Sequence, residues 1–155
     1  MTSNDLTIER IFDAPVERIW QLWATAEGFQ KWYGPEGFTI PTADMDVRVG
    51  GKRLFSMQSP DGAMTMWFCG EYREVTPTSR LVYTESMSDE HGNVMSPADM
   101  GMPGHPEVTE VVVELDETDG KTRMVMTHVG IPADSPGAGG WAQAFDKMAA
   151  VVAGA

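Results

Sequence analysis

The spacing of hydrophobic residues changes from two residues to a helical period within the first third of the chain. Residues 6–12 alternate and predict a strand, in which Arg10 falls on the same side as the apolar residues. The next apolar residues lie at i, i+3, i+4 and i+7 and predict a helix that begins near Pro15. This stripe consists of Val16, Ile19, Trp20 and Trp23. Thr25 can cap a second short helix, which carries Phe29, Trp32 and Tyr33 and ends at Gly34-Pro35.

From residue 38 onward the pattern is typical of strands and hairpins. The predicted strands span residues 38–49, 52–58, 64–75, 80–86, 109–115 and 122–129. Turn residues separate them, including the pair Gly50-Gly51, the sequence SPDG at 59–62 and the pair Asp119-Gly120. Residues 87–108 contain much Ser, Asp, Gly, Pro and Met, and a loop of about twenty residues is long for a compact domain. Its methionines favour a lid that touches something apolar.

The last segment predicts a helix that starts within residues 136–140. Trp141, Phe145, Met148 and Val152 lie on one side of it, with Asp146 and Lys147 pointing outward. About thirteen helical residues span roughly 20 Å, which is enough to lie across a sheet. One strand, two helices, six strands and a helix do not form a βαβ alternation. The order predicts a single α+β domain over residues 1–155, with helices on one face of an antiparallel sheet and a cleft between them.

The composition narrows the classes of function. A net charge of −12 disfavours nucleic acid and anionic membrane surfaces, since both require basic patches. The single cysteine, Cys69, excludes an internal disulfide and is expected to be a buried structural thiol in a strand. The first residues lack a signal-peptide pattern and no apolar run reaches the roughly 20 residues of a membrane span, so we expect a cytoplasmic protein. An acidic surface is compatible with a homodimer.

No cofactor is expected from the motifs. The sequence lacks the glycine-rich phosphate-binding patterns and the CxxC pattern. Its three histidines, His91, His105 and His128, do not have the spacing of a zinc site.

Six segments in a fixed order resemble a known superfamily. They are ERIFDAPVERIWQLW, EGFQKWYGP, DVRVGGKRLFSM, GEYREVTPTSRLVYTE, EVVVELDETDGKTRMVMTH and GGWAQAFDKM. Together they resemble the START-like, or birch-pollen-allergen-like, superfamily (SRPBCC), and within it the branch of homologues of the activator of the heat-shock-protein-90 ATPase. The resemblance implies a helix-grip fold, in which a seven-stranded antiparallel sheet curls round the C-terminal helix and two short helices close one end of a cavity.

The same resemblance leaves the activity open, because the superfamily includes lipid carriers, polyketide cyclases, allergens and co-chaperones. The chain lacks the separate N-terminal domain of the eukaryotic co-chaperone, so the branch name does not by itself imply a chaperone partner.

Apolar residues on the inward faces of these elements are candidates for lining the cavity. They are Trp32, Tyr33, Phe38, Met66, Phe68, Tyr83, Met124, Met126, Trp141 and Phe145. The alternative is that they fill a core. Three polar residues share these faces by strand parity, namely Arg10, Glu85 and His128, and would orient a ligand. For them the alternative is that Arg10 and Glu85 form a structural pair, or that a bulge turns one of them outward.

Two classes of function follow. The first is a binding module, a carrier or sensor for a small apolar or aromatic molecule. The second is a cyclase- or dehydratase-like enzyme with His128 or Glu85 as general base and Arg10 stabilising an anion. A third reading, a co-chaperone-like domain that binds a protein, predicts an exposed apolar patch outside the cleft.

Overall fold

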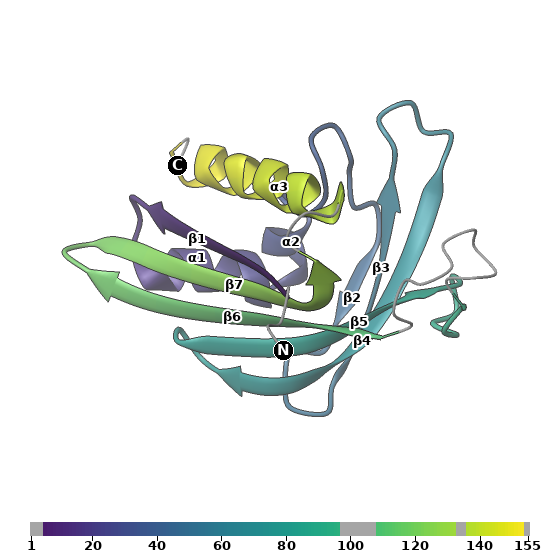
Figure 1. Cartoon of the computed structure of the whole chain (residues 1–155), viewed down its shortest axis with the longest axis horizontal. Coiled ribbons are helices and arrows are strands. Elements are labelled where there is room, and N and C mark those ends of the chain that lie inside the picture. Colours follow the sequence, from purple (N-terminus) through teal and green to yellow (C-terminus); the bar gives the residue numbers. More distant parts are fainter. Residues whose placement is uncertain (1–4, 97–107, 133–135, 154–155) are drawn as a thin grey trace.

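The computed structural model describes residues 5–96, 108–132 and 136–153, and its centre is one curled sheet. The elements are β1 (Asp5–Phe12), α1 (Val16–Ala24), α2 (Ala26–Phe29), β2 (Ala43–Met45), β3 (Lys52–Gln58), β4 (Thr65–Thr76), β5 (Arg80–Ser88), β6 (Thr109–Thr118), β7 (Lys121–Pro132) and α3 (Pro136–Ala153). The seven strands are antiparallel neighbours in the order β1-β7-β6-β5-β4-β3-β2. In Figure 1 α3 lies against one side of the curled sheet, as predicted for a helix-grip fold.

Local turn chemistry sets the hairpins. Asp119 and Gly120 have φ angles of 55° and 77°, and the pair joins β6 to β7 in the tight turn that the sequence predicts. Gly50 also adopts a positive φ, and a Cβ on Gly51 would lie 2.0 Å from the carbonyl oxygen of Asp46. Gly50, Gly51 and Gly120 therefore suit the turns that precede β3 and β7 better than other residues would.

The predicted strand over residues 38–49 is wrong for most of its length. Only Ala43–Met45 forms β2, and Thr39 makes one isolated bridge to Gln58. Pro41 lies between these two paired stretches and has no N–H to donate to a ladder. The alternation of side chains continues through this segment, but the backbone pairs only in two short pieces.

The second helix is also shorter than predicted. The Thr25 hydroxyl accepts a hydrogen bond from the Gly28 N–H, which confirms the cap, but α2 ends at Phe29. The Trp32 and Tyr33 N–H groups both donate to the carbonyl of Phe29 just after the end of α2, and both residues are buried. The Trp32 indole donates to the carbonyl of Leu22 at 2.7 Å, so a tertiary contact rather than a longer helix sets its position.

The C-terminal helix α3 is longer than predicted and packs its apolar side against the core. Trp141, Phe145 and Met148 are buried, and Asp146 is exposed. Lys147 does not point outward as predicted. Its Nζ donates to the backbone carbonyls of Tyr33, Pro35 and Phe38 at 3.2–3.3 Å, and thereby ties α3 to the segment that follows α2.

Two other predictions have mixed outcomes. Cys69 lies in β4 as expected, but it is only partly buried. The predicted loop 87–108 begins two residues later because β5 continues to Ser88, and its central residues, with Met100, Met102 and His105, lie outside the described residues.

Candidate ligand-binding site

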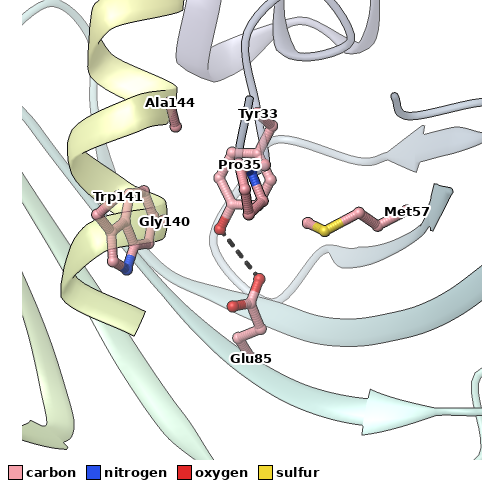
Figure 2. Close-up of a pocket in the computed structure, with 8 residues that line it drawn as sticks. Tyr33, Pro35, Met57, Glu85, Gly140, Trp141 and Ala144 are labelled. Carbon is pink, nitrogen blue, oxygen red and sulfur yellow. Dashed lines mark hydrogen bonds between the residues drawn. The ribbon is translucent and has the colours of Figure 1, made fainter. Parts of the chain in front are cut away.

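A cavity of about 170 Å³ lies between α3, β3, β5 and the segment after α2. It is lined by Tyr33, Gly34, Pro35, Met57, Glu85, Gly140, Trp141 and Ala144. In Figure 2 Trp141 and Ala144 approach from α3, Met57 from the opposite side and Glu85 from below. The walls are therefore apolar, and a single carboxyl group interrupts them.

Two glycines let the walls of the cavity approach each other closely. A Cβ on Gly140 would lie 3.3 Å from the ring of Pro35, and one on Gly34 would lie 3.2 Å from the terminal methyl of Met57. Gly34 also has a φ of +90°, a conformation that other residues rarely adopt. The chain therefore brings two turns of backbone close to the cavity where larger side chains would fill it.

Glu85 supplies the polar group of the cavity. The Tyr33 hydroxyl donates to Glu85 Oε1 at 3.1 Å, so the contact of 3.0 Å between the two tyrosine hydroxyls has Tyr83 as donor. Burial raises the pKa of Glu85, and the charge of Arg53 and the Tyr33 hydrogen bond oppose that rise. Burial and the nearby Glu85 carboxyl together raise the pKa of Tyr33 well above its ordinary value. Tyr33 therefore remains a hydrogen-bond donor at neutral pH.

A buried arginine lies in the core near this carboxyl group. Arg53 on β3 is 2% exposed, and its guanidinium carbon lies 3.6 Å from the centroid of the Tyr83 ring. The rings of Phe29, Phe55 and Tyr72 surround it at 5.1–5.7 Å. Burial alone lowers the pKa of Arg53, but its tyrosine neighbours and Glu85 together raise it above the ordinary value. The guanidinium is therefore charged inside an aromatic box.

A glycine on the neighbouring strand β4 leaves room for the Arg53 side chain. Arg53 pairs with Gly70 of β4, and a Cβ on Gly70 would lie 3.3 Å from the Arg53 side chain and 1.8 Å from the Thr84 carbonyl oxygen. Glycine is thus required by the close approach of β4 to β5.

The His128 side chain fixes the position of the Trp141 indole, which forms one wall of the cavity. The Trp141 Nε1–H donates to Nδ1 of His128 at 2.9 Å, and Nε2 of His128 lies 2.9 Å from Thr109 Oγ1. Because the indole nitrogen can only donate, Nδ1 of His128 is the unprotonated nitrogen in this contact. The pair holds Trp141 at one orientation against the cavity.

The structure distributes the predicted site residues unequally. Three of them, Tyr33, Glu85 and Trp141, line the cavity. Five fill the core, where they are almost fully buried: Trp32, Tyr83, Met124, Met126 and Phe145. Phe38, Met66 and Phe68 are partly buried and pack against the core.

The two remaining polar candidates lie outside the lining. His128 is buried behind Trp141. Arg10 faces α3 as its parity predicts, and it forms an ion pair of 3.0 Å with Asp146 and a hydrogen bond to the carbonyl of Ala142. The described contacts of Arg10, Glu85 and His128 thus go to different partners.

Sequence reasoning missed Gly34, Pro35, Met57, Gly140 and Ala144 as lining residues, and it missed Arg53. A signal existed for Arg53 and Met57, because both share strand parity with the buried Phe55. No comparable pattern marks the glycines, which contribute only by lacking a side chain.

Over the part of the chain that the structure describes, no three His, Cys, Asp or Glu side chains are grouped so that they could hold a metal ion. Within the same residues, no helix has the length and hydropathy needed to cross a membrane.

The curled seven-stranded antiparallel sheet and the C-terminal helix laid against it define a protein of the helix-grip class. The family model of Activator of Hsp90 ATPase homolog 1-like proteins matches residues 13–153. The chain belongs to this family.

Solved structures agree with this fold. A protein from Mycobacterium smegmatis is 27% identical, with a TM-score of 0.79 and coverage of 96% of this chain and 90% of that chain. A protein from Chromobacterium violaceum is 23% identical, with a TM-score of 0.77 and 96% coverage of both chains. The AHSA1 protein from Silicibacter pomeroyi is 22% identical, with a TM-score of 0.74 and coverage of 96% and 97%. A search of the curated proteins found no match.

Proposed function

We propose that this protein binds a small, mainly apolar ring compound reversibly in the cavity between the sheet and α3, in the manner of a carrier or sensor. The observation that carries the proposal is an apolar space of about 170 Å³ with one polar group on its wall. Ligand sites in proteins are typically apolar cavities with a few placed polar groups.

The volume limits the ligand to about one ring. An apolar cavity of about 150 Å³ accepts a benzene molecule, whereas drug-sized ligands occupy roughly 300–1,000 Å³. The cavity described here is near the lower value. The proposal therefore concerns single-ring compounds rather than polycyclic or long-chain ones.

The wall residues suit such a ring. Tyr33 and Trp141 meet edge to face, with centroids 5.4 Å apart, and Met57 adds a polarizable thioether. Aromatic faces and thioethers make favourable contacts with aromatic rings. The hydrogen bond from Trp141 to His128 keeps this wall in place before a ligand enters, which reduces the ordering that binding requires.

The test uses toluene as a probe and one filled-cavity variant. Ala144→Leu adds three carbons to the cavity wall, and Ala150→Leu, at an exposed position of the same helix, is the matched control. Titration calorimetry is expected to show toluene binding to the unmodified protein and to Ala150→Leu, and loss of binding in Ala144→Leu. Native mass spectrometry of gently purified protein would also show any bound compound. If toluene does not bind the unmodified protein, or binds Ala144→Leu equally well, the proposal is refuted.

A further inference from the structure

The Glu85 carboxyl group is where the cavity offers a ligand a hydrogen-bond partner. Glu85 Oε1 accepts the Tyr33 hydroxyl, and among the described residues no hydrogen bond reaches Oε2. In Figure 2 the Glu85 carboxyl group lies at the floor of the cavity, between Trp141 and Met57. A ligand in this space therefore meets a hydrogen-bond acceptor, because the Tyr33 proton is already used.

The surrounding charges decide which donor fits. Arg53 and Glu85 are electrostatically coupled within the core, since each shifts the pKa of the other toward the charged form. The Arg53 guanidinium carbon lies 3.6 Å from the centroid of the Tyr83 ring, and the Tyr83 hydroxyl contacts the Tyr33 hydroxyl that donates to Glu85, so a positive charge already lies close to this chain of hydrogen bonds. An ammonium ligand would add a second positive charge near Arg53 in a mainly apolar site, and a carboxylate ligand would be placed against Glu85. A neutral donor avoids both penalties.

We infer that the ligand is an uncharged single-ring compound that carries a hydroxyl group, such as a simple phenol, an inference that rests on the proposed function. Its hydroxyl group donates to the Glu85 carboxyl group, and its ring lies between Trp141 and Met57. The cavity volume admits the ring, Oε2 accepts the hydrogen bond from the hydroxyl group, and the nearby charge of Arg53 makes a neutral ligand the favoured one.

Four probes of similar size separate these contributions. Toluene and p-cresol differ only by the hydroxyl group, and benzylamine and benzoate add a charge of each sign. A hydrogen bond to a charged group contributes enough that p-cresol is expected to bind about tenfold or more tightly than toluene. Benzylamine and benzoate are both expected to bind more weakly than p-cresol.

Two variants assign the preference to Glu85. Glu85→Gln keeps the shape of the side chain but weakens the acceptor, so the ratio of p-cresol affinity to toluene affinity should fall several-fold. Glu71→Gln, on an exposed pair with Lys52 of the neighbouring strand, is the matched control and should keep the ratio. Circular dichroism of each variant shows that it is folded before titration.

The outcomes separate the two proposals. Equal affinity for toluene and p-cresol, an unchanged ratio in Glu85→Gln, or tighter binding of benzylamine or benzoate would each overturn the ligand class while leaving the cavity a binding site. Failure of both toluene and p-cresol to bind would overturn the proposed function itself.

Discussion

Replacing Arg53 by methionine tests how the core tolerates a buried charge. Methionine keeps most of the apolar stem, so the change removes chiefly the guanidinium that lies 3.6 Å from the Tyr83 ring centroid. A desolvated cation–π contact contributes about 2 kcal/mol. Removing one member of a buried charge pair costs about 3–5 kcal/mol in total, because the other charge is left uncompensated. We therefore expect Arg53→Met to lower the free energy of unfolding by about 3–5 kcal/mol near pH 7.

The pH dependence gives this prediction a sign. Burial already raises the pKa of Glu85 in the folded protein, and Arg53 limits that rise. The folded state therefore binds more protons than the unfolded state between the ordinary glutamate pKa and the raised one, and stability declines as the pH increases through that window. Without Arg53 the folded pKa of Glu85 rises further and the window widens upward. The deficit of the variant is thus expected to be largest near neutral pH and to shrink on acidification toward about pH 5.

Urea unfolding followed by tryptophan fluorescence measures both effects. Arg48→Met is the matched control, since Arg48 forms an exposed ion pair with Asp46, and its effect should stay within about 0.5 kcal/mol. Combining Arg53→Met with Glu85→Gln should cost less than the sum of the two single changes, with a coupling of about 1–3 kcal/mol. Additive effects, or a deficit that does not change between about pH 5 and 7, would refute the electrostatic reasoning.

Two further changes test the backbone and the indole wall. Gly70→Ala places a Cβ 1.8 Å from the Thr84 carbonyl oxygen and should destabilise the fold by about 3 kcal/mol or more. Gly139→Ala, in the first turn of α3, meets nothing within 4 Å and should be neutral or stabilising by about 0.5 kcal/mol. Thermal unfolding compares the two variants, and similar midpoints would contradict the steric argument. Trp141→Phe removes the donor to His128 Nδ1 and should cost about 1–3 kcal/mol in urea unfolding, together with weaker toluene binding; an unchanged affinity would show that the fixed indole is not part of the site.

Most of the fold could be predicted because its elements carry unmistakable local patterns. The stripe of α1, the alternation in β6 and β7 and the Asp119-Gly120 turn each correspond to the structure. The errors arise where tertiary contacts override such patterns. Strand pairing is interrupted at Pro41 although the alternation continues, and the Trp32 indole turns back to Leu22 although its spacing suits a longer helix.

The candidate site was less accessible to sequence reasoning for a physical reason. Parity correctly placed Glu85 on the inner face of β5, and size and hydrophobicity selected Tyr33 and Trp141. The same criteria also selected Phe145 and Met126, which fill the core instead. Whether an inward-facing aromatic residue lines a cavity or packs against a neighbour depends on which side chains are missing opposite it, and that follows only from the three-dimensional arrangement.

Two departures from ordinary core packing coincide at the cavity. One is the space of about 170 Å³ between α3, β3, β5 and the segment after α2, which the neighbouring side chains leave unfilled. The other is the Glu85 carboxyl group on the cavity wall, which a well-packed apolar residue would often replace without loss of stability. A core shaped for stability alone has reason to avoid each of them, because voids and buried charges both lower the free energy of unfolding. Where a sequence otherwise agrees with its fold, such local departures are expected at functional sites. Because both departures occur at the same cavity, they favour a bound ligand there over a purely structural role for the lining residues.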